Sequence, residues 1–572
     1  MNNSRLPSFP VALQALATLV CLMVFGAGRL MADPVPAAPD KTLRVFLFAG
    51  QSNMVGSDSR AEHIALYPPF EGLEQPQKAV NFTYCIGRED KARSDGWTEL
   101  RPVNNTVGPE LSFARRVGEH SDAPIAIIKC AAGGTTLGGD WNPDEPTGFK
   151  LYPLALEIVR ASLADLDRRK IAYRLEGFMW HQGENDMFDD KFRASYAKNL
   201  ANFIASWRRD LQAPQLRFYI GELCTKTVWG MDNRAPMHAI GLAQREVTEA
   251  DPYADFVPTS HVGVEIGGDA GLHYHYGTLG QLEHGVNYAD AYLRTIDKEP
   301  KVARPLARWP YAKGAPVKLF VLAGHRNMEG ERAFVQQLQA LKGKEALAKD
   351  NARIAYRYSV GGGYKVSNGW EPLGPAGCYD TFGPELSFGA TLASGLARKG
   401  KSDIAIAKYT HSGSQIVDWT PEGSETKSRN LYPGFIEFVR ASVQDLKDRG
   451  HEVELAGVFY HLGENDMSFG PYRDKAVGRL AALVAQSRKD LGLPSLPWFV
   501  SQQPAPDDTS ANITEVTAEL QRLAAADANF IHIKAFDLPG WQTTGTESKL
   551  VITTPGVVAL GELLAEGYLR RR

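Results

Sequence analysis

The sequence predicts two tandem α/β domains, each a doubly wound parallel sheet covered by helices on both faces in three layers. Two observations lead to this fold class. The chain contains one sequence pattern twice, and within each copy short apolar runs alternate with segments of helical periodicity. Alternating strands and helices are typical of a parallel sheet between helical layers. The length of 572 residues also exceeds that of a single domain.

The composition is that of an ordinary soluble globular protein. Hydrophobic residues make up 44% and charged residues 23% of the chain, which argues against a collagen, a disordered protein or a multi-span membrane protein. Lys and Arg number 63 against 66 Asp and Glu, a net charge of −3. No basic excess favours a nucleic acid or an anionic membrane as partner. Five cysteines are too few for a disulfide scaffold.

Residues 1–32 are predicted to be a secretory signal peptide. Arg5 precedes the apolar run Val11–Ala27, and small residues near Ala32 offer a cleavage site. An uncleaved N-terminal anchor is the alternative. We therefore expect a secreted or periplasmic protein with no other membrane segment, since no other run approaches ~20 apolar residues. Export permits but does not demand a disulfide among the remaining cysteines, Cys85, Cys130, Cys224 and Cys378.

The repeat divides the chain into domains. Several motifs recur in the same order at an offset between 274 and 280 residues. They are LRVFLFAGQSNMVG at 43–56 with VKLFVLAGHRNMEG at 317–330, GPELSF at 108–113 and 383–388, LYP at 151 and 431, and HQGENDM at 181–187 with HLGENDM at 461–467. A period this long indicates a duplicated domain. We predict a first domain at 41–296, a proline-rich linker at 297–316 and a second domain at 317–572.

Apolar patterning predicts the elements of the first domain. Four short, near-continuous apolar runs suit strands buried on both faces: Val45–Phe48, Ile125–Ile128, Gly177–Trp180 and Leu216–Ile220. Stripes within 158–166 and 192–207 recur every three or four residues, as helices require. In this fold class, binding sites lie at the carboxyl ends of the strands.

The first strand leads directly into Gly50-Gln51-Ser52-Asn53-Met54. A serine on a strand-to-helix turn has an exposed hydroxyl with backbone N–H groups beside it. A nucleophilic serine and part of an oxyanion hole need this arrangement. The alternative is a serine that merely caps the helix.

Two further strand ends carry polar or glycine-rich segments. Gly133 and Gly134 lie in Ala131–Thr135, where glycines leave N–H donors open to a substrate; an ordinary turn is the alternative. Amide side chains in His181–Asp186 could donate to a developing oxyanion. There the alternative is a structural polar turn.

An acid and two histidines precede the last helix of the first copy. Asp269, His273 and His275 would complete the order Ser…Asp…His of many α/β hydrolases. The pair His273-x-His275 could instead bind a metal, but no carboxylate or cysteine cluster accompanies it at ligand spacing. We expect no metal and no cofactor.

Together these segments resemble the SGNH (GDSL-like) hydrolase superfamily, and within it the sialate O-acetylesterase-like and carbohydrate esterase family 6 group. The resemblance rests on GQSNM at 50–54, AAGGT at 131–135, HQGEND at 181–186 and HYGTLGQLEHG at 275–285. It covers residues 43–295 well and 317–572 in degenerate form.

The resemblance implies a flavodoxin-like, SGNH-type fold and assigns roles to residues. Ser52 becomes the nucleophile and its N–H an oxyanion donor, with further donors from the Gly133–Gly134 turn and Asn185. The family's spacing from the base to two helix glycines fits His275, with Gly280 and Gly285 following; His273 as the base is the alternative. The family's acid, three residues before the histidine, is replaced by Leu272 or Ala270, which leaves Asp269 as the acid to consider.

The duplication separates residues of chemistry from residues of structure. Five positions change together in the second copy: Gln51 to His325, Ser52 to Arg326, Gly133 to Ser412, Gln182 to Leu462 and His275 to Val551. Asn53, Glu110, His181, Glu184, Asn185 and Asp186 are kept. We therefore expect Gln51 and Gln182 to serve the oxyanion or substrate site and the second copy to be non-catalytic. Of the kept residues, Asn185 could both hold a turn and line the oxyanion hole.

The sequence thus predicts a secreted serine esterase that removes O-acetyl groups from a carbohydrate through an acyl-enzyme. Its expected partner is an acetylated carbohydrate substrate, with no nucleic acid and no membrane beyond the signal segment. Two alternatives remain: a glycan-binding protein without turnover, and an SGNH esterase that acts on a lipid or thioester.

Overall fold

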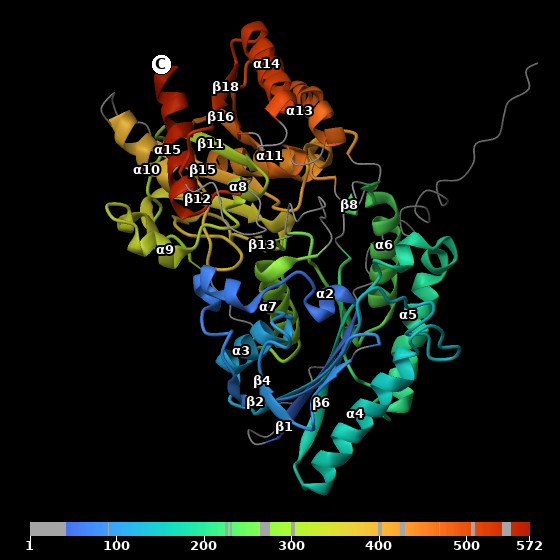
Figure 1. Ribbon diagram of the computed structural model, residues 1–572. Helices are drawn as coiled ribbons and strands as arrows, with labels where there is room; N and C mark the ends of the chain where they lie inside the picture. The colour runs from blue at the N-terminus through green and yellow to red at the C-terminus, as the bar shows by residue number, and fades with distance from the viewer. Residues whose placement is uncertain are drawn as a thin grey trace, which may run out of the picture.

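The computed structural model contains two α/β domains, one above the other in Figure 1. It describes residues 42–571 apart from gaps at 90, 224–226, 229–230, 264–274, 299–303, 398–402, 424–429, 468–469, 505–509 and 540–550. Each domain is built on one large sheet. The predicted fold class, two tandem doubly wound domains with parallel sheets, is confirmed.

The sheet of the N-terminal domain has the strand order β10-β7-β6-β1-β5-β2-β3, with β4 also paired to β2. The pairs from β10 across to β2 are parallel, and β3 and β4 join β2 antiparallel. The strands are β1 (Leu43–Gly50), β2 (Gln77–Ile86), β3 (Ala92–Arg93), β4 (Thr98–Leu100), β5 (Ile125–Ala131), β6 (Tyr173–His181), β7 (Phe218–Gly221) and β10 (Ala254–Val257). A small separate hairpin pairs β8 (Thr227–Val228) with β9 (Met231–Asp232).

Helices cover both faces of this sheet because its strands are apolar on both sides. One core cluster joins the sheet to α4 (Leu151–Arg168), α5 (Asp190–Asp210) and α6 (Arg234–Ala250). The opposite cluster joins it to α3 (Glu110–His120) and α7 (Gly277–Thr295). Short helical turns complete the domain: α2 (Ser52–Val55), η2 (Ala61–Leu66), η3 (Pro68–Phe70) and η4 (Asp186–Phe188).

The C-terminal domain repeats this topology. Its sheet order is β13-β12-β15-β11-β16-β17-β18, with β14 paired to β12. The strands are β11 (Val317–Gly324), β12 (Asn351–Val360), β13 (Lys365–Val366), β14 (Glu371–Leu373), β15 (Asp403–Thr410), β16 (Val453–Leu462), β17 (Trp498–Gln502) and β18 (Phe530–Lys534). The helices are α8 (Arg326–Glu329), α9 (Val335–Ala340), η5 (Glu345–Ala348), η6 (Gly361–Gly363), α10 (Glu385–Ala397), η7 (Ile416–Trp419), α11 (Tyr432–Asp448), α12 (Glu464–Met467), α13 (Gly470–Asp490), α14 (Ser510–Ala526) and α15 (Thr554–Arg570).

The four predicted strands are found as β1, β5, β6 and β7, and the two helical stripes as α4 and α5. The apolar patterning missed β2 and β10. The last part of the predicted linker packs on the C-terminal domain: Tyr311 is buried there and its hydroxyl donates to the Ile404 carbonyl at 2.5 Å.

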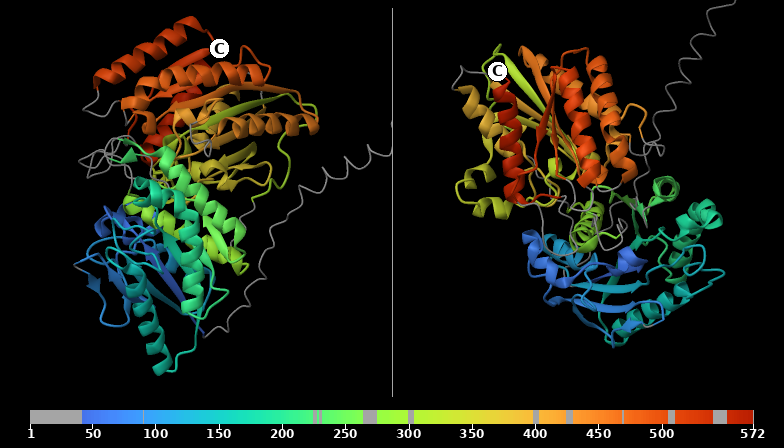
Figure 2. Two further views of the ribbon diagram at one scale, coloured as in Figure 1. Left: turned by 90° about the vertical axis from the view of Figure 1, so that its right-hand side faces the viewer. Right: turned by 45° about the horizontal axis from the view of Figure 1, so that its top comes forward.

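The carboxyl ends of the two sheets face each other across the domain boundary. Figure 1 shows α2, which follows β1, on the side of its domain turned toward the other, and both views of Figure 2 show the two domains meeting through loops. Within the described part of the chain, no helix combines the length and apolar character needed to cross a membrane. Cys85, Cys130 and Cys378 are free thiols, and Cys224 lies outside the described residues.

Candidate active site

The turn after β1 places Ser52 as the first residue of α2. Gln51 occupies the N-cap position, so Ser52 is not the cap of this helix. Gly50, with φ +150°, precedes the turn, where any Cβ would lie 2.0 Å from the His181 carbonyl oxygen. Only glycine permits this close approach of β1 to β6. Ser52 is 7% exposed.

Gln51 connects the serine turn to the loop after β6. Its Oε1 accepts the Gly183 N–H at 3.1 Å, and its Nε2 donates to Asn185 Oδ1 at 3.2 Å. With Oδ1 used in this way, Asn185 keeps its Nδ2 donor for another acceptor. Gln51 therefore orients Asn185 and acts as a positioning residue.

The Gly133–Gly134 turn lies directly against Ser52. A Cβ on Gly133 would meet Ser52 Cβ at 3.5 Å, so no side chain of the turn separates its backbone from the serine. Gly134 has φ +67°, which favours glycine. Nη1 of the exposed Arg88 lies 3.3 Å from where a Gly134 Cβ would be. The sequence analysis did not single out this cation.

Gln182 binds the residue that follows the Gly133–Gly134 turn and does not present its amide to a ligand. It is fully buried, and Nε2 donates to the Thr135 carbonyl at 3.0 Å and to Asp186 Oδ2 at 2.5 Å. Its Oε1 accepts from the Tyr196 hydroxyl at 3.2 Å. Both amide hydrogens are thus occupied, which corrects the expectation that Gln182 donates to the oxyanion.

Asn53 joins three elements of the site. Its Nδ2 donates to Glu184 Oε1 at 2.6 Å, and its Oδ1 accepts the Tyr276 N–H at 3.2 Å. Burial acts to raise the pKa of Glu184, but hydrogen bonds from His181 and Asn53 outweigh it and hold that pKa below its usual value. These kept residues bind the ends of β1 and β6 to the start of α7, as expected of a structural set.

His275 lies just before α7, and its Nδ1 is 2.5 Å from Asp58 Oδ2. The hydrogen bond from His275 lowers the pKa of the Asp58 carboxyl. Asp58 belongs to the Ser52 segment and was missed by the sequence analysis. A signal was available, because position 58 becomes Arg332 in the second copy and so changes together with Ser52 and His275.

The sequence analysis also named an acid and a second histidine for the catalytic group. Asp269 and His273 lie outside the described residues. Among the described residues, no group of three or more His, Cys, Asp or Glu side chains could hold a metal ion.

Comparison with known proteins identifies the family of the chain. The family model described as "Carbohydrate esterase, sialic acid-specific acetylesterase" matches the chain twice, at residues 42–294 and 316–570. The chain belongs to this family. The resemblance drawn from GQSNM and HQGEND is thereby confirmed.

Individual relatives each match about one domain of this carbohydrate esterase family member. A probable carbohydrate esterase of Arabidopsis thaliana is 25% identical over 269 residues, which are 46% of this chain and 94% of the relative. Among solved structures, NanS is 17% identical with a TM-score of 0.35, covering 45% of this chain and 98% of NanS. A carbohydrate acetylesterase from Xanthomonas citri is 18% identical with a TM-score of 0.33, covering 47% and 61%. Membership in the family rests on the match to the family model.

The second family domain keeps the backbone of the serine turn but not its chemistry. The N-cap residues Gln51 and His325 have φ/ψ of −104/−149° and −104/−147°. Arg326 stands where Ser52 does, and its Nε donates to Glu331 Oε2 at 2.6 Å. Both side chains are buried. The position of His275 is taken by the buried Val551.

An internal carboxylate fills the region that corresponds to the Gly133 turn in the second domain. Glu329 Oε2 accepts the N–H groups of Ser412 at 3.1 Å and of Gly361 at 3.0 Å. Ser412 is the counterpart of Gly133. Burial raises the pKa of Glu329 to about 7. The Ser412 N–H, which corresponds to the Gly133 N–H, is therefore already bound to Glu329.

Proposed function

We propose that the N-terminal domain is a serine O-acetylesterase that acts on an acetylated carbohydrate. His275 accepts the Ser52 hydroxyl proton as the serine oxygen attacks the acetyl carbonyl. The Ser52 and Gly133 N–H groups and Asn185 Nδ2 donate to the resulting oxyanion. The sugar hydroxyl leaves with the proton from His275. Water, which gives a proton to His275, then attacks the acyl-enzyme; acetate is released and the proton returns to the Ser52 oxygen.

The observation that carries this proposal is the contact between Asp58 and His275. A carboxylate that accepts the Nδ1 proton fixes the imidazole tautomer and makes Nε2 the basic nitrogen. It also stabilises the imidazolium that forms during attack. The carboxylate and the nucleophile lie six residues apart, so the segment that follows β1 would supply both.

The C-terminal domain is, on this proposal, non-catalytic. Arg326 carries no nucleophilic oxygen and is paired with Glu331, while Val551 offers no base. We also propose that the protein is exported, on the strength of Arg5 and the apolar run Val11–Ala27. Recovery of the mature chain outside the cytoplasm, beginning near Asp33, would test the export step.

The Ser52→Ala variant tests the proposed function. Removal of the attacking oxygen should lower kcat by about 10⁴- to 10⁶-fold and leave the melting temperature within a few degrees of wild type. Ser195→Ala, a serine on α5, is the matched control and should keep full activity. We would measure hydrolysis of p-nitrophenyl acetate and acetate release from acetylated xylan, sialosides and sulfated algal glycans.

Labelling with a serine-directed phosphonate completes the test. We expect one adduct per chain, on Ser52, and none on the Ser52→Ala variant. Wild-type protein that binds acetylated glycans without turnover and takes no label would instead be a glycan-binding protein. Preference for acyl thioesters or lipid esters over every glycan on the panel would change the substrate class but keep the serine chemistry.

A further inference from the structure

The vestigial site of the C-terminal domain is occupied by a segment of the N-terminal domain. The Ser412 hydroxyl donates to the His261 carbonyl at 2.5 Å, and Ser260 Oγ lies 3.3 Å from His411 Nε2. A Cβ on Gly413 would lie 1.7 Å from the Ser260 carbonyl oxygen. The turn that corresponds to the Gly133 turn therefore packs directly against residues 260–261.

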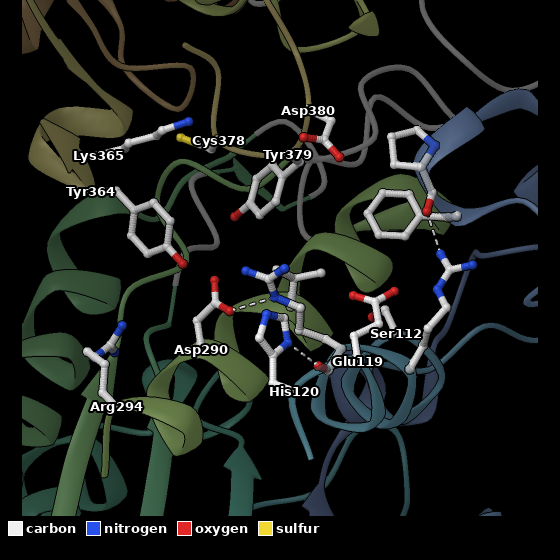
Figure 3. A pocket seen from close by; sticks show the side chains of 15 residues that line it. Ser112, Glu119, His120, Asp290, Arg294, Tyr364, Lys365, Cys378, Tyr379 and Asp380 are labelled. Carbon is white, nitrogen blue, oxygen red and sulfur yellow. Dashed lines mark hydrogen bonds and ion pairs between the residues drawn. The ribbon is translucent and has the colours of Figure 1, made fainter. Parts of the chain in front are cut away.

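Two tyrosines of the C-terminal domain bind the same region from the side. The His261 ring stacks on Tyr364 at a centroid distance of 3.9 Å, and the Tyr379 hydroxyl lies 2.8 Å from His261 Nε2. Both tyrosine hydroxyls also donate to Asn287 Oδ1 of α7, at 2.8 and 2.7 Å. Figure 3 shows Tyr364 and Tyr379 above Asp290 and Arg294 of α7, across a cavity of about 470 Å³ between the domains.

These contacts continue to the residue beside His275. Thr259, next to Ser260, accepts a hydrogen bond at Oγ1 from the Tyr276 hydroxyl at 2.8 Å. Asn287 Nδ2 donates to the Pro258 carbonyl at 3.1 Å. Tyr276 follows His275 directly, and its N–H is bound by Asn53 beside Ser52. Hydrogen bonds at both ends of the segment 258–261, together with its backbone, thus join Ser412 and Tyr379 to Tyr276, the neighbour of His275.

From this path we infer that the C-terminal domain positions His275 for catalysis in the N-terminal domain, with Ser412, Gly413 and Tyr379 as its positioning residues. The inference rests on the proposed function for the role of His275. In the C-terminal domain itself, Arg326 is paired with Glu331 and the Ser412 N–H with Glu329, so these groups are not available for a reaction. The inference gives this domain a role in the reaction of the other one. A displacement of residues 258–261 would move Tyr276 and, with it, the imidazole.

Two variants of the full chain test the inference. Gly413→Ala places a methyl group against the Ser260 carbonyl, and Tyr379→Phe removes the hydroxyl that binds His261 and Asn287. Misplacement of a catalytic group by about 1 Å can cost 10²-fold, so we expect kcat to fall by about 10- to 100-fold with KM within about twofold. The matched controls are Gly478→Ala, on an open face of α13, and Tyr358→Phe, whose hydroxyl binds Glu371 within the C-terminal domain; both should keep wild-type kcat.

A second readout does not depend on turnover. The proton between His275 Nδ1 and Asp58 should give a far-downfield NMR resonance that disappears in Asp58→Ala. Gly413→Ala and Tyr379→Phe should shift or broaden it, and the two controls should not. If Gly413→Ala fails to fold, Ser412→Ala, which removes the bond to the His261 carbonyl, takes its place.

The outcomes separate the two proposals. Unchanged kcat and an unchanged resonance in Tyr379→Phe and in the Gly413 or Ser412 variant would overturn the positioning role. Equal losses in the controls would do the same. A wild-type protein without esterase activity would refute the proposed function, while the resonance would still decide whether the C-terminal domain positions His275.

Discussion

Individual residues of the serine turn have separable tasks, because the side chains of Gln51, Asn53 and Asp58 each have defined partners. Gln51 uses both ends of its amide to orient Asn185, and Asn53 uses both ends of its own to join Glu184 to the Tyr276 N–H. Asp58 binds His275. The chemistry proposed for Ser52 therefore depends on side chains within six residues of it on the same segment.

The Asp58→Asn variant should lower kcat by about 10²-fold or more, because an amide cannot stabilise the imidazolium and can select the wrong tautomer. KM and the melting temperature should change little, since the Asp58 side chain is 59% exposed. Asp122→Asn, an exposed aspartate between α3 and β5, is the control. Asp269→Asn would be assayed under the same conditions. If that variant loses turnover and Asp58→Asn does not, Asp269 is the acid.

Separate alanine variants should rank the two histidines. We expect His275→Ala to lose activity to the level of Ser52→Ala, because His275 holds the bond to Asp58. His273→Ala should retain a measurable fraction. Steady-state kinetics with p-nitrophenyl acetate decide the ranking, and the reverse order would make His273 the base.

At the scale of elements, strand ends and the turns that follow them are held by buried polar groups. Asp186 accepts the Leu137 and Gly138 N–H groups at 2.8 and 2.9 Å, and Asp466 accepts the Ile416 N–H at 2.9 Å in the second domain. Burial raises the pKa of Asp186 to about 6. The same carboxylate thus fastens the segment after β5 or β15 in both domains, whether or not a nucleophile is present.

Gln182→Leu should lower both the stability of the protein and its turnover. The change removes the side-chain donor to the buried Thr135 carbonyl and one of the donors to the Asp186 carboxylate, which costs about 1–3 kcal/mol in the free energy of unfolding. A looser Gly133 turn should also reduce kcat. Urea unfolding and kinetics of Gln182→Leu would be compared with those of Gln444→Leu, an exposed position on α11. Full stability together with a large loss of kcat would restore Gln182 as a direct oxyanion donor.

At the scale of the whole molecule, two copies of one fold meet through the loops at the carboxyl ends of their sheets. In the C-terminal copy, Arg326 stands at the position of Ser52 and pairs with Glu331, and the buried carboxylate of Glu329 lies near Glu331 and Lys408. Such groups link the stability of the molecule to pH.

Glu329→Gln should flatten the dependence of stability on pH. Burial raises the folded-state pKa of Glu329 from 4.5 to about 7, so between these values the folded protein binds more protons than the unfolded chain. The free energy of unfolding must therefore fall as pH rises through this window, by roughly 3 kcal/mol at most for this group. Glutamine does not titrate, so the variant should gain stability relative to wild type on going from pH 5.0 to pH 7.5.

Urea unfolding at the two pH values measures this difference. The buried acids and histidines that do not interact with Glu329 contribute equally to both proteins and cancel. Glu157→Gln, an exposed position on α4, is the control and should show the same pH dependence as wild type. A difference between Glu329→Gln and wild type that does not change with pH would contradict the assignment.

The sequence alone determined the fold class and the duplication. Strands buried on both faces and amphipathic helices each have a characteristic local pattern of apolar residues. The apolar pattern did not predict β2, because this strand lies toward the sheet edge, where Lys78 and Asn81 are exposed and interrupt the apolar run. Paired motifs also pointed to Ser52, Gly133 and His275, since residues that change together between two copies of one fold need no structure to be recognised.

Only the tertiary structure decided which polar groups meet. Asp58 and His275 are 217 residues apart and lie beside each other because α7 packs on the face that holds α2. Gln182 belongs to the same motif as Asn185, yet its amide is used inside the fold. The contact of Ser412 with His261 depends on how two domains dock. Hydrogen bonds are short-ranged and directional, so a side chain's partner is fixed by the three-dimensional packing of distant segments and not by the residues beside it in the chain.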